Sequence, residues 1–233
     1  MKKILKIIVV IIILVLCISS VYIYKGYSMY KEALQVASIS EKVANIKSNE
    51  NYETIDALPQ IYLNAVIATE DHRFYEHNGI DIIAINRAII HDIKNGNLNE
   101  GGSTITQQLA KNIYFTQEKK LERKIAEIFM AFKIEKELDK DQILELYLNT
   151  SYFGRGFYNI KEASLGYFGK EPTFMDAYES TLLAGIPNAP SIYGENDSLA
   201  KERQNQVLDQ MIKYEYLTNE EKNSILASHT IEE

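Results

Sequence analysis

The sequence predicts a mostly α-helical domain that follows one membrane-spanning helix. Glycine (11) and proline (4) are scarce among the 233 residues, so the turn residues that a many-stranded fold needs are few. Every strong hydrophobic pattern in the chain has helical spacing. With 46% hydrophobic and 24% charged residues, the composition is that of one well-packed globular domain with a short appendage.

The appendage is an uncharged and mainly aliphatic run from Ile7 to Tyr24, which is about the minimum length for a transmembrane helix. A cleaved signal peptide is the alternative, but the run exceeds the usual apolar region of about 7 to 15 residues and no Ala-x-Ala-like site follows it. Three lysines precede the run and only Lys25 closely follows it. The positive-inside rule therefore predicts a single-pass protein of the cell membrane, with residues 1–25 as cytoplasmic N-terminus and anchor and the domain on the extracytoplasmic face.

Residues 26–57 are polar and weakly periodic, and we expect them to form a stalk before a domain over 58–233. Pro59 suits the first turn of a helix that runs towards Glu70, and the polar and aromatic stretch 70–79 predicts a loop. Asp81 is a plausible N-cap for a helix that ends at Asn95-Gly96.

Three further helices are expected beyond residue 100. Ser103 is the predicted N-cap of a helix with apolar residues at 105, 109 and 113, and a stripe from 121 to 132 predicts the next helix. Asp139 and Gln142 resemble a capping box for a third. The tail over 201–233 is expected to be a helical hairpin or partly disordered.

The charge balance excludes a general polyanion binder. Residues 26–233 carry 21 basic and 32 acidic side chains, a net charge of −11, so nucleic acid is not an expected partner. An anionic ligand would have to bind a local cluster. One basic stretch contains seven cations against four acids: Lys111, Lys119, Lys120, Arg123, Lys124, Lys133 and Lys136.

The loop from Glu70 to Gly79 concentrates titratable groups. A carboxylate beside aromatic residues at a helix end, such as Glu70, could have its pKa raised towards that of a general base. The alternative is a structural loop, held by hydrogen bonds of Asp71 and His77 with Phe74 in the core. A zinc site is disfavoured because the spacing of the two histidines does not match a metalloprotease motif.

Two helices are candidates for an anion site. Gly101-Gly102-Ser103-Thr104 opens a helix, whose free backbone N–H groups and dipole suit an anion. Arg123 and Glu127 share one face of the next helix. The alternative in each case is ordinary surface structure, a capped helix and an exposed ion pair worth less than about 1 kcal/mol.

Together these motifs resemble the peptidoglycan glycosyltransferases, family 51, in their monofunctional membrane-anchored form. The matching motifs span about residues 58–193: Glu70-Asp-x-x-Phe74-x-x-His77-x-Gly79-x-Asp81, Gly102-Ser-Thr-Ile-Thr-Gln107-Gln108-x-x-Lys111-Asn112, Arg123-Lys124-x-x-Glu127, Ile143-Leu144-x-x-Tyr147-Leu148-Asn149 and Gly185-x-Pro187-x-Ala-Pro190. Asn159 departs from the pattern, since the family usually has glycine there.

The resemblance implies a lysozyme-like helical domain with a small hydrophobic lobe that dips into the membrane. It implies polymerisation of lipid II into β-1,4-linked glycan with inversion and release of undecaprenyl diphosphate, in bacterial cell wall synthesis. Glu70 would be the general base and Glu127 the second active-site carboxylate. The donor site would comprise Ser103, Gln107, Gln108, Lys111, Asn112, Lys119, Arg123 and Lys124, and the motif residues Asp71, Phe74, His77 and Gly79 would be structural.

The resemblance also implies partners and a cofactor. Lipid II, the nascent glycan chain, the lipid bilayer and cell-wall synthesis proteins are the expected partners. Glu127 would either orient the cations or help to hold a divalent ion, Mg or Mn, at the diphosphate. Two other classes remain as alternatives: a lytic hydrolase that uses Glu70 as general acid, which would need no cation cluster, and an inactive anchored scaffold, against which the intact Glu70 and Glu127 argue.

Overall fold

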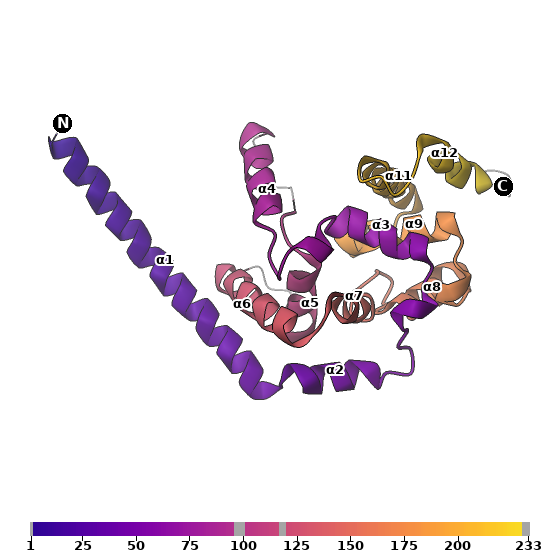
Figure 1. The fold of residues 1–233 in the computed structure, drawn as a ribbon, viewed down its shortest axis with the longest axis horizontal. Helices are drawn as coiled ribbons and strands as arrows, with labels where there is room; N and C mark the ends of the chain where they lie inside the picture. The colour runs from indigo at the N-terminus through magenta and orange to yellow at the C-terminus, as the bar shows by residue number, and fades with distance from the viewer. Residues whose placement is uncertain (1, 96–100, 117–119, 230–233) are drawn as a thin grey trace.

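The computed structural model describes residues 2–95, 101–116 and 120–229, and throughout these ranges it contains helices and no strands. The predicted helical class is confirmed (Figure 1). The α-helices are α1 (Lys2–Val36), α2 (Ile39–Lys47), α3 (Gln60–Glu70), α4 (Ile82–Asn95), α5 (Ile105–Tyr114), α6 (Leu121–Glu137), α7 (Lys140–Leu148), α8 (Ile160–Phe168), α9 (Ala177–Gly185), α10 (Pro190–Tyr193), α11 (Asp197–Lys213) and α12 (Asn219–Ser228).

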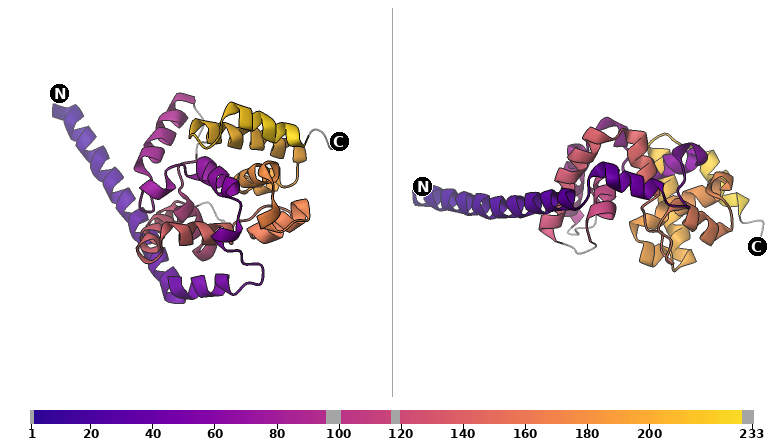
Figure 2. Two further views of the ribbon diagram at one scale, coloured as in Figure 1. Left: turned by 45° about the vertical axis from the view of Figure 1, so that its right-hand side comes forward. Right: turned by 90° about the horizontal axis from the view of Figure 1, so that it is seen from below.

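Helix α1 contains the predicted span. Within the described chain it is the one helix long and apolar enough to cross a membrane, and its most apolar 18-residue window is 0% buried. Its N-terminal half extends away from the rest of the molecule (Figures 1 and 2). This geometry fits a single-pass membrane protein.

Residues 26–57 differ from the stalk that the sequence suggested. Helix α1 continues to Val36 and packs on α6, and Ile39 at the start of α2 is 1% exposed. Val43 and Ile46 of α2 also pack against the core. The apolar faces of the C-terminal part of α1 and of α2 are short. The sequence alone therefore does not show that they are buried, whereas their contacts with α6 and the core do.

The core lies where α3, α5, α7, α9 and α11 meet. Tyr62 and Ala65 of α3, Leu109 of α5 and Leu144 of α7 are fully buried. The predicted capping box of Asp139 and Gln142 begins α7, and the described part of the C-terminal tail is helical in α11 and α12. Helix α3 thus passes through the core and ends at Glu70.

Helix α4 stands apart from this core. It rises on the same side of the molecule as the free half of α1 (Figures 1 and 2). Asp81 accepts a hydrogen bond from the Ala84 N–H, as its predicted capping role requires. Ile82, Ile83 and Ile90 are each more than half exposed, so α4 presents apolar surface to its surroundings.

Candidate active site

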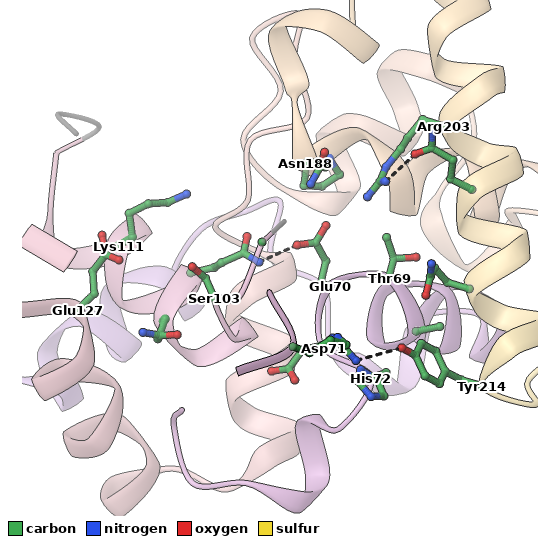
Figure 3. Close-up of a pocket in the computed structure, with 18 of the residues that line it drawn as sticks. Thr69, Glu70, Asp71, His72, Ser103, Lys111, Glu127, Asn188, Arg203 and Tyr214 are labelled. Atoms are coloured by element: carbon green, nitrogen blue, oxygen red, sulfur yellow. Dashed lines mark hydrogen bonds between the residues drawn. The ribbon is translucent and has the colours of Figure 1, made fainter. Parts of the chain in front are cut away.

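A cleft of about 640 Å³ lies at the C-terminal end of α3. Its walls are contributed by α3, α4, α5, α6 and α11, with the segment before α5 and the residues after α9 (Figure 3). The predicted site residues that line it are Glu70, Asp71, Ser103, Gln107, Gln108, Lys111, Arg123, Lys124 and Glu127. Three separate motifs of the sequence therefore converge on one cavity.

Glu70 is the last residue of α3 and points into the cleft (Figure 3). Gln108 Nε2 donates a hydrogen bond to Glu70 Oε2 at 2.7 Å, whereas Oε1 has no protein hydrogen-bond partner among the described residues. Burial raises the Glu70 pKa, and the Gln108 bond and the charges of Arg203 and Lys111 oppose this rise. Such a carboxylate is held in place and keeps one oxygen free to accept a proton.

The two predicted glutamines have different contacts. Gln108 holds Glu70, and Tyr147 O–H donates to Gln108 Oε1 at 3.4 Å. Gln107 is 2% exposed and forms a capping box with Thr104 at the start of α5. Gln108 therefore belongs to the chemistry of the cleft, while Gln107 mainly fixes the helix that carries it.

Asp71 joins the loop after α3 to the start of α5. His77 Nε2 lies 2.9 and 3.0 Å from the two Asp71 carboxylate oxygens, and the Ile105 N–H donates to Oδ2 at 3.0 Å. Thr104 Oγ1 donates to the Gly79 carbonyl at 2.7 Å. These bonds set the position of Glu70, at the end of α3, relative to Gln108 on α5.

We expect Asp71→Ala to lower the free energy of unfolding by about 2 to 4 kcal/mol, because it leaves a buried histidine and a helix N–H without their shared partner. Denaturant unfolding in detergent measures this change. The control is Glu76→Ala, which removes an exposed carboxylate 3.7 Å from Arg73 and should cost less than about 0.5 kcal/mol. Equal stability of the two variants would contradict a structural role for Asp71.

Two other residues of the loop fill structural positions. Phe74 is fully buried. Gly79 has a φ of +88°, and a Cβ there would lie 3.1 Å from the backbone carbon of Ala131 on α6, so glycine is needed both for the turn and for the close approach. The zinc interpretation finds no support here, since His77 binds Asp71 and His72 stacks on Tyr214 with ring centroids 4.0 Å apart.

A cation cluster, which we define as Lys111, Arg123 and Lys124, surrounds Glu127. Glu127 is 1% exposed; its Oε1 is 2.9 Å from Arg123 Nε, an ion pair without hydrogen-bond alignment, and its Oε2 accepts from Lys124 Nζ at 3.0 Å. Lys124 Nζ also donates to Ser103 Oγ at 2.6 Å. Burial lowers the Lys111 pKa, and Arg123 and Lys124 lower it further while Glu127 raises it. Three cations around one buried carboxylate leave net positive charge for an anionic ligand.

The residues around Glu127 do not fit a resident divalent ion. Both of its oxygens already face cations, and the other carboxylates that line the described part of the cleft are Glu70 and Asp71. Those two are engaged with Gln108 and with His77 and Ile105. Mg²⁺ needs several oxygen ligands in near-octahedral geometry, which these engaged carboxylates do not supply.

The predictions for Asn112, Lys119 and Ser103 have three different outcomes. Asn112 is on α5 but is not among the residues that line the cavity, and Lys119 lies outside the described residues. The N-cap of α5 is Thr104 instead of the predicted Ser103, because Thr104 Oγ1 accepts from the Gln107 N–H while also bonding Gly79. Ser103 Oγ is therefore available to accept the hydrogen bond from Lys124 Nζ.

The far wall of the cleft consists of residues that the sequence did not predict. Arg203 on α11 is close enough to Glu70 to lower its pKa, and Figure 3 shows the two side chains across the cavity from each other. Arg87 of α4, Lys213 and Tyr214 also line it, with Arg87 NH1 donating to Tyr214 O–H at 3.5 Å. Arg203, Lys213 and Tyr214 belong to no motif, and they reach the cleft because α11 packs against α3 and α9.

Replacing Arg203 with glutamine should shift the pH profile of the reaction. Its positive charge lowers the Glu70 pKa, so its removal raises that pKa and delays ionisation of the base. The acid limb of kcat/KM should therefore move to higher pH. The matched control is Lys201→Gln on the same helix, which should leave the limb in place; an unmoved limb in Arg203→Gln would contradict the coupling.

Comparison with known proteins identifies the family. The profile described as transglycosylase matches residues 38–212, which include the whole cleft except for Lys213 and Tyr214. The chain belongs to the transglycosylase family. The predicted resemblance to peptidoglycan glycosyltransferases is thereby confirmed, as is the expectation of an enzyme of glycosyl transfer.

The similar curated proteins are longer transglycosylase relatives. Penicillin-binding protein 1A of Aquifex aeolicus is 46% identical over 172 residues, 73% of this chain and 24% of the relative. Penicillin-binding protein 1F of Bacillus subtilis is 40% identical over 210 residues, 85% of this chain and 29% of the relative. Penicillin-binding protein 1A of Neisseria lactamica is 40% identical over 200 residues, 84% and 25% respectively. The chain thus spans about a quarter of the length of these relatives.

Proposed function

We propose that this transglycosylase polymerises lipid II into β-1,4-linked glycan strands in bacterial cell wall synthesis. The observation that carries the proposal is one cleft that holds both a carboxylate with a free oxygen, Glu70, and the cation cluster around Glu127. The first suits proton abstraction from a hydroxyl, and the second suits a diphosphate leaving group. A lytic hydrolase that acts on finished glycan would not need the cation cluster.

The proposed reaction is a single inverting displacement. Glu70 Oε1 accepts the proton of the acceptor's 4-hydroxyl as that oxygen attacks the anomeric carbon of the growing chain. The bond from this carbon to the diphosphate oxygen breaks, and its electron pair leaves with undecaprenyl diphosphate. Gln108, which holds Glu70 Oε2, keeps the free oxygen directed into the cleft.

The cation cluster stabilises the departing diphosphate. Negative charge develops on the leaving oxygen of the diphosphate in the transition state. Cations that the protein already holds in place therefore bind the transition state more tightly than the ground state. Glu127 holds Arg123 and Lys124 in position without neutralising all three cations. We assign Glu127 this orienting role, and any divalent ion would be held chiefly by the diphosphate itself.

The far wall of the cleft suits the acceptor. Lipid II as acceptor brings a second diphosphate, and Arg87, Arg203 and Lys213 supply cations on the side of the cavity away from α6. In this arrangement Glu70 lies between the two anionic groups. The whole domain carries a net negative charge, so both sites depend on short-range contacts with these residues.

We propose that α1 places the domain on the extracytoplasmic face, with α4 as the lobe that dips into the bilayer. The lysines at the N-terminus support this orientation. The exposed isoleucines of α4 on the side of the free half of α1 support contact with lipid. Cell-wall synthesis proteins remain expected partners.

The experiment that tests this function is incubation of the purified full chain with fluorescent lipid II in detergent, with products separated by gel electrophoresis. We expect polymer that muramidase digests, and one undecaprenyl diphosphate released for each glycosidic bond formed. Lipid II that is consumed without polymer, or that remains intact, would overturn the proposal.

A further inference from the structure

Helix α1 passes from the membrane span into the domain without a break. It is continuous from Lys2 to Val36, so residues 7–24 cover about 27 Å and the following twelve residues about 18 Å at 1.5 Å per residue. The first part is exposed, and the second lies beside α6 (Figure 1). A flexible linker between anchor and domain is therefore missing from this part of the chain.

The contact between α1 and α6 is close. Gly26 is buried, and a Cβ at this position would lie 2.6 Å from the Ile125 Cβ and 2.9 Å from the Glu122 carbonyl oxygen. Beyond it, the rings of Tyr27 and Tyr30 pack against Phe129 with centroids 5.3 and 5.9 Å apart. Only a residue without a side chain allows this approach, and the aromatic contacts continue it along both helices.

The face of α6 opposite this contact belongs to the active site. At 100° per residue, Arg123 and Glu127 both lie about 160° around the helix from Ile125. Arg123 and Glu127 line the cleft, while Ile125 meets Gly26. One helix thus carries the membrane anchor on one side and the leaving-group cations on the other.

From this continuity we infer that α1 is a rigid positioning element, which sets the orientation of the cleft relative to the bilayer. Gly26 is the positioning residue that lets α1 seat on α6. The inference rests on the proposed function, because orientation matters only if the substrate is held in the membrane. A simple tether would concentrate the enzyme at the surface but leave its tilt free, and small misplacements of reacting groups are costly.

The test is a matched pair of variants of equal length. In the hinge variant, Ile23-Tyr24-Lys25 becomes Gly-Pro-Gly, which breaks the helix just before the docked part; in the control the same residues become Ala-Ala-Ala, which keeps it helical. Polymerisation rates are measured on lipid II in liposomes and on lipid II dispersed in detergent, where no bilayer fixes orientation.

The inference predicts that the hinge variant loses about tenfold in rate in liposomes relative to the control, while the two match in detergent. Equal rates in liposomes would overturn it, and so would an equal loss in both media, which would mean local damage to the site. Gly26→Val, which forces α1 off Ile125, should give the same selective loss in liposomes. A wild-type chain that polymerises in neither medium would instead refute the proposed function.

Discussion

Glu70→Gln is expected to lower turnover of lipid II by about 100-fold or more, because the amide cannot take the proton of the acceptor hydroxyl. The same change should leave the thermal stability equal or higher. Burial raises the Glu70 pKa, which means that the folded state disfavours its charge, and the neutral amide removes that cost. Steady-state kinetics and a melting curve in detergent measure both effects.

The kinetic and melting measurements together distinguish a role of Glu70 in the reaction from a structural role. Loss of activity at equal or increased stability assigns Glu70 to the reaction, in contrast to the stability loss expected of Asp71→Ala. Near-wild-type polymerisation by a well-folded Glu70→Gln enzyme would remove Glu70 from the mechanism.

Lys111→Ala and Arg123→Ala should each cost about 2 to 4 kcal/mol of transition-state stabilisation, or about 30- to 1000-fold in rate. The loss should fall mainly on kcat, since the leaving diphosphate gains charge in the transition state and contacts to it strengthen there. Arg123→Ala also frees one oxygen of the buried Glu127 from its cation, so its melting temperature should be measured beside its kinetics.

Lys133→Ala is the control for these two variants. Lys133 is on the same helix as Arg123 but pairs with Glu137 at 2.6 Å and is not a lining residue of the cleft. Its removal should change the rate less than about twofold, since exposed ion pairs contribute little. Equal and small losses of rate in all three variants would mean that the cation cluster is an ordinary solvated surface without a role in the reaction. The lytic alternative would then be open again.

Residue spacing and capping motifs in the sequence predicted the features that depend on interactions between residues close together in the chain. The 3.6-residue period placed Arg123 and Glu127 on one face of α6 and Ile125 and Phe129 on another, and the capping box at Asp139 fixed the start of α7. The departure at Asn159 also has a local explanation: its side chain accepts from the Glu162 N–H and caps α8.

What the sequence did not predict depends on contacts between distant segments. The seating of residues 26–36 on α6 needs the close approach at Gly26, which no periodicity reveals. Arg203 joins the cleft only because α11 packs on α3 and α9. The shift of the α5 cap to Thr104 likewise depends on its bond to Gly79, 25 positions away.

The central claim is that this cleft builds glycan and does not cleave it. The most direct measurement gives the purified protein lipid II and, in a parallel reaction, finished uncrosslinked glycan strands, and follows chain length in both. We predict that lipid II becomes polymer and that the finished strands keep their length. Shortening of the strands with no polymer from lipid II would contradict the claim.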